Sequence, residues 1–350
     1  MLMNSRPSKL DPTTPPKRKR RRWLRWTLRI IAILVVILLI AAELFARHYL
    51  GLGDPPLWIE HPEIEYMAMP SRTYHRYGNI VTYNAYSMRN DEFSRHKEDP
   101  RELRVMCLGD SVINGGSHVD QADLLTARLK TRLVKALERP ATVGNISAGS
   151  WGPGNLLAYV KTFGLFDADI LVLVLSSHDH TDHPTFEPVV GVERRMPDRT
   201  PLFALSEVTH RFLPIYFGWA KDEEDDIEER SDAEKVRKTL ASLREIIYTA
   251  HETGATVIVL QHPKYEEVLG EELPGHRVLS NVARSMGIEP IQAATAFRDA
   301  LEEDALIRKG LQEGESTMPY RDRIHPNQVG HRILADLLFD EIMKVVAKVP

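Results

Sequence analysis

The stretch that decides the fold reads Ile170-Leu-Val-Leu-Val-Leu175, six apolar residues in succession. A strand with one face in water alternates apolar and polar residues, whereas a strand covered on both faces is apolar throughout. The stretch therefore predicts a central strand of a parallel sheet, buried on both sides.

Further stretches on either side, none longer than six residues, are candidates for other strands. They are Val105–Leu108, Ala141–Ile146, Ala255–Leu260 and Glu289–Ile291. Helical spacing of apolar residues is found in Ala122–Leu137, Asp232–His251, Leu279–Ser285 and His331–Val346. Strands that alternate with helices predict right-handed βαβ units, and hence a parallel sheet with helices on both faces.

The formal net charge of −4 hides an asymmetry along the chain. Residues 1–29 hold ten Lys and Arg against one acid, Asp11, a net of +9, which leaves −13 for residues 30–350. Phosphate binding needs a basic surface, so the acidic body argues against nucleic acid as a ligand. The chain has one cysteine, Cys107, which excludes an intrachain disulfide.

An apolar segment follows the basic end. Its uncharged core, Ile30–Ala42, has 13 residues, and the longer segment Trp26–Ala46 has 21. About 20 residues are needed to cross a bilayer, and Arg29 can extend back to the head groups. Because Lys and Arg ahead of a span keep that end in the cytoplasm, we expect a basic cytoplasmic tail over 1–22 and a single-pass signal-anchor helix over 23–46.

A cleaved signal peptide is the main alternative to the anchor. The small-x-small pattern of a cleavage site is poor here, since Leu44-Phe45-Ala46 begins with a large residue. The uncleaved anchor is therefore favoured, with the rest of the chain outside the cytoplasm. Residues 47–100 contain several prolines and no long periodic stretch, which predicts an irregular lead-in packed against a main domain over 101–350.

Gly109-Asp110-Ser111 comes directly after the first predicted strand. Ligand-binding groups of open α/β sheets collect at the carboxyl ends of strands. A serine on such a turn can present its hydroxyl as a nucleophile, and its own N–H can face a developing oxyanion. Asp110 is expected to have a structural role in the turn.

A second motif, Asp322-Arg-Ile-His325-Pro326, lies near the end of the chain. An aspartate three residues before a histidine can hold the imidazole through one ring N–H. The other ring nitrogen is then free to take a serine proton. The sequence also lacks a Gly-x-Ser-x-Gly elbow, which argues against the usual α/β-hydrolase layout.

These two motifs resemble the first and last blocks of the SGNH/GDSL hydrolase family, and the resemblance spans residues 103–346. Asn84–Arg89 is similar to the lead-in of membrane-bound members. The resemblance implies a flavodoxin-like three-layer α/β/α sandwich and hydrolysis of acyl or acetyl esters without metal or cofactor. It makes Ser111 the nucleophile, with His325 and Asp322 completing a triad.

The family also has two blocks that supply oxyanion donors. The backbone donor, usually a glycine, follows an asparagine. Here Gly149 and Ser150 both follow Asn145, and Gly149 is slightly favoured. The third block normally reads Gly-x-Asn-Asp, but this chain has Ser176-Ser-His-Asp179. His178 therefore stands where the asparagine side chain belongs, and its ring can donate only in the right tautomer or when protonated. Asp179 is expected to support the site structurally.

Several alternatives remain open. The run His178-Asp-His-Thr-Asp-His183 also has the residue types of a metal site, although a polar active-site rim has the same composition. The same triad would serve an O-acetyltransferase acting on cell-surface polysaccharide, and the fold also permits a non-catalytic binding module. An anchored esterase outside the cytoplasm would most easily meet acetylated polysaccharide or lipid. His118 and His331 are expected at the surface or the rim.

Overall fold

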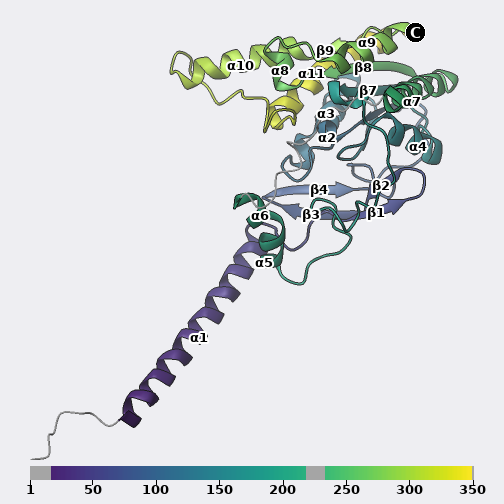
Figure 1. Ribbon diagram of the computed structural model, residues 1–350. Coiled ribbons are helices and arrows are strands. Elements are labelled where there is room, and N and C mark those ends of the chain that lie inside the picture. Colours follow the sequence, from purple (N-terminus) through teal and green to yellow (C-terminus); the bar gives the residue numbers. More distant parts are fainter. Residues whose placement is uncertain (1–16, 218–232, 349–350) are drawn as a thin grey trace, which may run out of the picture.

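A five-stranded parallel sheet lies at the centre of the protein (Figure 1). The computed structural model describes residues 17–217 and 233–348. The strands are β5 Leu103–Gly109, β6 Ala141–Ser147, β7 Ile170–Ser176, β8 Thr256–His262 and β9 Ile291–Gln292. They run in the order β6-β5-β7-β8-β9, and every neighbouring pair is parallel. This is the flavodoxin-like order, so the expected fold class is confirmed.

The central strand β7 is buried over its whole length. Its side chains point alternately to the two faces of the sheet, so each face receives three of the six apolar ones. Ile170, Val172 and Val174 lie in one core, and Leu171, Leu173 and Leu175 lie in the other. A strand between two helical layers must be apolar at every position, which explains the unbroken run.

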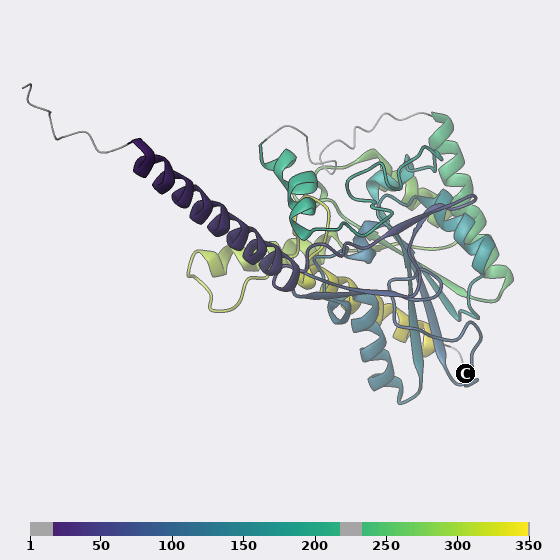
Figure 2. The same ribbon diagram turned by 90° about the horizontal axis from the view of Figure 1, so that it is seen from below.

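Helices cover both faces of the sheet (Figure 2). One core takes side chains from α4 Pro153–Phe163, α7 Ala233–Glu252 and α9 Pro274–Ser285. The other takes side chains from α3 Leu125–Leu137, α10 Ala294–Arg308 and α11 Gln328–Val346. The short helical pieces are α2 Ser111–Asn114, η1 Gln121–Asp123, η2 Ser177–His180, α5 Ala204–Glu207, η3 Val208–Phe212, α6 Leu213–Tyr216 and α8 Tyr265–Val268.

The lead-in over 47–100 is more regular than the sequence suggests. It contains two antiparallel hairpins, β1 Trp58–His61 with β2 Glu65–Ala68, and β3 Arg72–Arg76 with β4 Asn79–Tyr83. Tyr66 and Tyr74 are buried in the same core as α4 and α7. Their strands are only four or five residues long, too short to show a clear alternation in the sequence.

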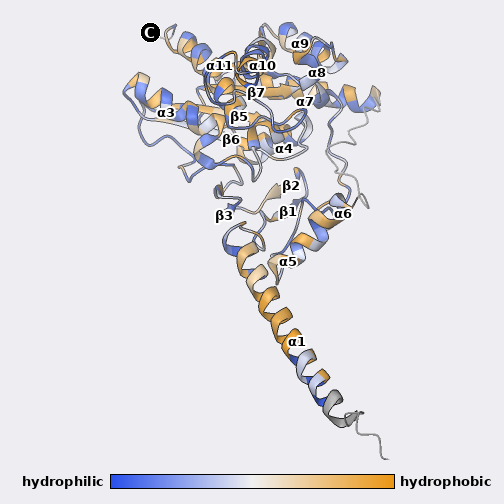
Figure 3. Ribbon diagram, turned by 90° about the vertical axis from the view of Figure 1, so that its left-hand side faces the viewer, coloured by the Kyte–Doolittle hydropathy of each residue, from blue (hydrophilic) through white to orange (hydrophobic). Residues whose placement is uncertain are grey.

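The N-terminal part of the described chain is one long helix, α1 Lys17–His48, which projects from the rest of the protein (Figures 1 and 2). Its middle is hydrophobic in Figure 3. The part Arg22–His48 is long and apolar enough to cross a membrane, as a signal sequence would also be. Residues 1–16 of the predicted tail lie outside the described residues.

Candidate active site

The residues singled out in the sequence meet at the carboxyl edge of the sheet. Ser111 follows β5, and His178 follows the neighbouring strand β7. The chain goes from β5 outward to β6 and then crosses back to β7, so the strand order reverses between β5 and β7. Such a switch point is where ligands bind in open α/β sheets.

The turn that carries Ser111 is held by its neighbours. Oδ1 of Asp110 accepts a hydrogen bond of 2.9 Å from the N–H of Val112, which caps α2. Gly115 ends this short helix with φ +70°, and a Cβ there would lie 2.7 Å from Cδ2 of Leu124. Only glycine meets both conditions without strain. The turn is thereby fixed at both ends.

Ser111, His325 and Asp322 form one continuous hydrogen-bonded line. Nε2 of His325 lies 2.9 Å from Oγ of Ser111. Nδ1 of the same ring lies 2.8 and 3.0 Å from the two carboxylate oxygens of Asp322. A carboxylate can only accept, so the proton sits on Nδ1 and Nε2 is free to accept the serine proton.

Asp322 also organises its own loop. Its Oδ1 accepts the backbone N–H groups of Ile324 at 2.9 Å and of His325 at 2.8 Å. Burial alone would raise the pKa of Asp322, but the hydrogen bond and the charge of His325, together with these N–H groups, hold that pKa well below its usual range. Asp322 is therefore ionised at neutral pH and can balance a positive charge on His325.

His262, at the end of β8, supports this loop and was not singled out in the sequence. Its Nε2 donates to the carbonyl oxygen of Ile324 at 2.6 Å. Complete burial lowers the pKa of His262 to about 4, so the ring is neutral at pH 7. On the other side of the motif, Asn327 caps α11 by accepting the N–H groups of Val329 and Gly330. The loop is tied to the sheet and to a helix.

His178 is buried among carboxylates. Its Nε2 lies 3.0 Å from Asp110, 3.7 Å from Asp179 and 3.7 Å from Asp182. Burial by itself would lower the pKa of His178, but the charges of Asp179, Asp110 and Asp182 outweigh it and raise the pKa to about 10. The ring is therefore an imidazolium at neutral pH, with a proton on both nitrogens. Asp182 belongs to this cluster, although no local pattern distinguishes it from the other residues of the His-Asp run.

The carboxylates around His178 do not behave alike. Burial alone would raise the pKa of Asp110, but the hydrogen bond and the charge of His178 outweigh burial, so the pKa of Asp110 is lowered. Burial and the charge of Asp110 raise the pKa of Asp179 well above its usual value. Asp179 accepts the N–H of Ser176 at 2.6 Å. Of the three carboxylates, that of Asp110 lies closest to the ring of His178. Potential ligand atoms of Asp110, His178 and Asp179 lie within 4.8 Å of one another, which is also the spacing that a metal ion would require.

Gly149 and Ser150, the two expected backbone donors, follow β6 directly. A Cβ on Gly149 would meet no atom within 4 Å, so the space beside it is open. Ser150 is exposed and has φ +59°, which is uncommon for a residue other than glycine. Within the described part of the chain, neither N–H has a hydrogen-bond acceptor. Both remain candidates for the donor.

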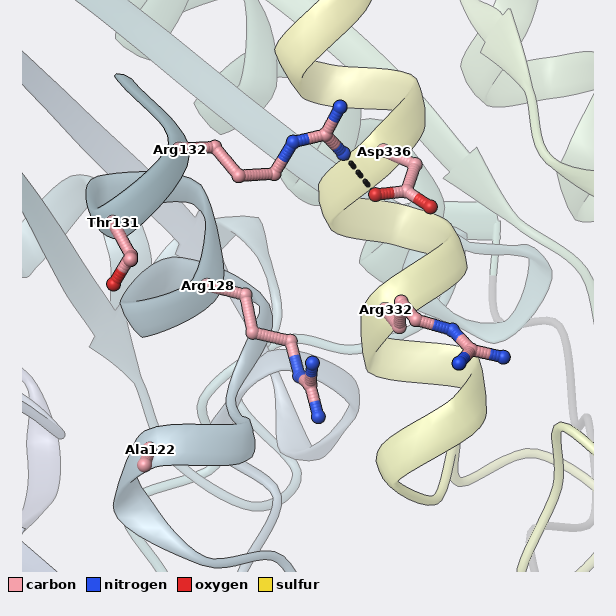
Figure 4. Close-up of a pocket in the computed structure, with 6 residues that line it drawn as sticks. All are labelled: Ala122, Arg128, Thr131, Arg132, Arg332 and Asp336. Atoms are coloured by element: carbon pink, nitrogen blue, oxygen red, sulfur yellow. Dashed lines mark hydrogen bonds and ion pairs between the residues drawn. The ribbon is translucent and has the colours of Figure 1, made fainter. Parts of the chain in front are cut away.

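Two features lie apart from this arrangement. A hollow of about 460 Å³ lies between α3 and α11, lined by Arg128, Arg132 and Arg332 among others, and it contains no triad residue (Figure 4). His331 is fully buried, so the prediction that it lies at the surface or rim was wrong. Its Nδ1 accepts the N–H of Leu125 at 3.2 Å, which joins α11 to α3. His118 is exposed, as expected.

No protein-family model matches the chain, and no curated protein matches its sequence. Similar solved structures include a two-domain esterase active on acetylated mannans, an α/β hydrolase from the metagenome of Lake Arreo in Spain, and a member of the lipolytic G-D-S-L family from Veillonella parvula. Their identities with this chain are 12%, 16% and 13%, and their TM-scores are 0.43, 0.42 and 0.38.

The three matches cover 71%, 68% and 69% of this chain, and 50%, 93% and 98% of the other chains in the same order. The chain thus spans about half the length of the two-domain esterase. Because both the sequence identities and the TM-scores are low, these matches carry no argument about function. A function has to be argued from the arrangement of Ser111, His325 and Asp322.

Proposed function

We propose that the protein is a membrane-anchored serine esterase that hydrolyses acyl or acetyl esters. The observation that carries this proposal is the hydrogen-bonded line from Ser111 through His325 to Asp322. A serine hydroxyl is a weak nucleophile unless a base removes its proton, and the base works only in the correct tautomer. The contacts of the His325 ring supply both conditions.

In the proposed reaction, Nε2 of His325 takes the proton of Ser111 as Oγ attacks the ester carbonyl carbon. The ionised Asp322 balances the imidazolium that forms. His325 then gives the proton to the oxygen of the leaving alcohol, and the acyl group stays on Ser111. Water, deprotonated by His325, attacks the acyl carbon. The bond to Oγ of Ser111 then breaks, His325 returns the proton to Oγ, and the acid is released.

The oxyanion of the tetrahedral intermediate needs donors that are already in place. We assign this role to the backbone N–H groups of Ser111 and of Gly149 or Ser150, and to the ring of His178. Asp110 holds that ring by an ion pair of 3.0 Å. A protonated imidazole brings a positive charge, which the usual asparagine amide does not.

The apolar helix α1 is the basis for the proposed location of the protein at a membrane. Its basic N-terminal end and its length support an uncleaved anchor with the body outside the cytoplasm. Esters on that side of a membrane include acetylated polysaccharide and lipid, and we propose one of these classes as substrate.

Hydrolysis of 4-nitrophenyl acetate by the full chain in detergent tests the activity. We expect Ser111→Ala to abolish turnover and Ser117→Ala, a matched change on the same loop, to leave it within about twofold. Of these two serines, Ser111 is the one whose hydroxyl contacts the ring of His325. A folded wild type without activity on acetyl or longer acyl esters would contradict the proposal.

A further inference from the structure

Apolar side chains are exposed on the segment of residues 202–217, which contains α5, η3 and α6. Leu202 is 88% exposed, Phe203 62% and Tyr216 82%, and Phe212 and Phe217 are also exposed. We call these five residues the apolar face. Single exposed apolar residues are common on soluble proteins, whereas several of them on one short segment are typical of a surface that meets a membrane or another protein.

The segment is fastened to the C-terminal end of α1. The carboxylate of Glu43 accepts the N–H of Ala204 at 2.8 Å and the N–H of Leu205 at 3.0 Å, and so occupies the start of α5. Arg47 donates to the carbonyl oxygen of Leu202 at 3.1 Å. Figures 1 and 3 both show α5 and α6 beside the end of α1 from which the body begins.

These bonds fix the depth of Leu202 and Phe203, the first two residues of the apolar face, relative to the proposed span. Glu43 precedes Ala46, the last residue of the expected span, by three positions, or about 4.5 Å along a helix. Leu202 and Phe203 directly precede the backbone that Glu43 binds, so they lie at nearly the same level. Phe45 and Tyr49 stack at 5.0 Å between ring centroids on the same end of α1. Exposed aromatic residues at that level are typical of the interfacial layer of a membrane.

We propose that the apolar face inserts into the outer interfacial layer of the same bilayer that α1 spans. The body then lies in contact with the membrane surface, and we call this contact the seat. This proposal rests on the proposed anchor. Leu, Phe and Tyr side chains on short helical pieces are suited to the boundary between head groups and acyl chains.

The seat would also orient the active site. Tyr77, on the turn between β3 and β4, donates its N–H to the carbonyl oxygen of Leu50, just after α1. The ring of His118 stacks on Tyr77 with centroids 5.1 Å apart, and Asn79 binds the carbonyl oxygen of Ser117 at 3.0 Å. Residues 117 and 118 lie on the loop that follows Ser111 and α2. The turn between β3 and β4 therefore contacts both the end of α1 and the loop that follows Ser111.

A fluorescence experiment on the full chain tests the seat. An environment-sensitive fluorophore is attached to Leu202→Cys in vesicles of phosphatidylcholine and phosphatidylglycerol. The vesicles contain lipids with a spin-label quencher either near the head group, which reports on position 202, or along the acyl chain, which reports on position 33. Cys107 is fully buried and its pKa is raised to about 12 by that burial, so it does not compete for the label. Leu311→Cys is the matched control, because Leu311 is 73% exposed and lies on another part of the body, after α10. Ile33→Cys, in the middle of α1, reports the anchor itself.

We expect quenching of at least about twofold at position 202 and almost none at 311, since only the first lies in the interface. Quenching at 33 but not at 202 would overturn the seat and leave the anchor standing. A blue-shifted but unquenched probe at 202 would show that another protein copy covers the face, and would also overturn the seat. A probe at 33 that responds to no membrane quencher would remove the anchor, and the seat with it.

Discussion

Nε2 of His325 lies 2.9 Å from Oγ of Ser111, although 214 positions separate the two residues in the sequence. The contact depends on two rigid loops at one edge of the sheet. Asp110 and Gly115 fix the turn of Ser111, while Asp322 and His262 fix the loop of His325. Because each loop is held independently of the other, changes to single members of the site should alter the chemistry without unfolding the protein.

Asp322→Asn should lower kcat by roughly 10⁴-fold with little change in KM, because an amide can donate to Nδ1 and so favour the wrong tautomer of His325. Hydrolysis of a soluble acetyl ester by the full chain measures both constants. Asp299→Asn, a change of the same kind at an exposed site on α10, should behave as the wild type. Equal activity of Asp322→Asn and the wild type would mean that Asp322 does not orient the base.

His178→Ala should reduce kcat by about 100- to 1000-fold, the usual cost of losing one oxyanion donor. His178→Asn should retain more activity than His178→Ala, because its amide can donate a hydrogen bond in the same region. The two variants are compared at neutral pH with circular dichroism as a check of folding. If both folded variants keep wild-type kcat, the ring of His178 has no part in the reaction.

The stability that His178 contributes should depend on pH. Its pKa is raised to about 10 in the folded protein by the carboxylates of Asp179, Asp110 and Asp182. An unfolded histidine has a pKa of about 6.5. The folded state binds this proton more tightly, so the contribution is complete below pH ~6.5 and is lost as the pH rises to about 10.

Thermal unfolding of the wild type and of His178→Gln over that pH range measures this effect. We expect the difference in Tm between the two proteins to shrink steadily as the pH rises. A difference that stays constant or grows would mean that His178 is neutral in the folded protein.

Chelators should not affect the activity. Asp110, His178 and Asp179 are close enough to share an ion, but the ring of His178 is protonated on both nitrogens and so has no lone pair to offer a metal. We expect prolonged dialysis against EDTA to change kcat by less than about twofold, because the proposed route uses only side chains and water. Activity that is lost with EDTA and restored by zinc would assign the cluster to a metal instead.

The sequence predicted the parts of the fold that are strongly periodic or unbroken. The run from Ile170 to Leu175 indicates a strand buried on both faces, and β7 has that place. Helices α4 and α10 were missed: α4 starts at a Gly-Pro pair that resembles a turn, and charged residues interrupt the apolar spacing of α10. The hairpins were missed because their strands are short, and they are stabilised by packing against the main core.

The candidate site divides in the same way. Ser111, Asp322 and His325 lie in local motifs with a clear chemical meaning, so the sequence could single them out. His262 and His331 are isolated histidines in the sequence, and their roles come only from contacts with distant segments at Ile324 and Leu125. The ion pair of His178 with Asp110 forms because β5 and β7 are adjacent strands, and no local sequence pattern predicts that pairing.

Labelling with a fluorophosphonate probe shows whether Ser111 is an activated nucleophile, because the probe traps only activated serines. The full chain in detergent is treated beside Ser111→Ala and His325→Ala, and mass spectrometry locates the adduct. We expect an adduct on Ser111 in the wild type and none at that position in either variant. A folded wild type that stays unlabelled, or equal labelling of Ser111 in His325→Ala, would contradict the proposed roles of Ser111 and His325.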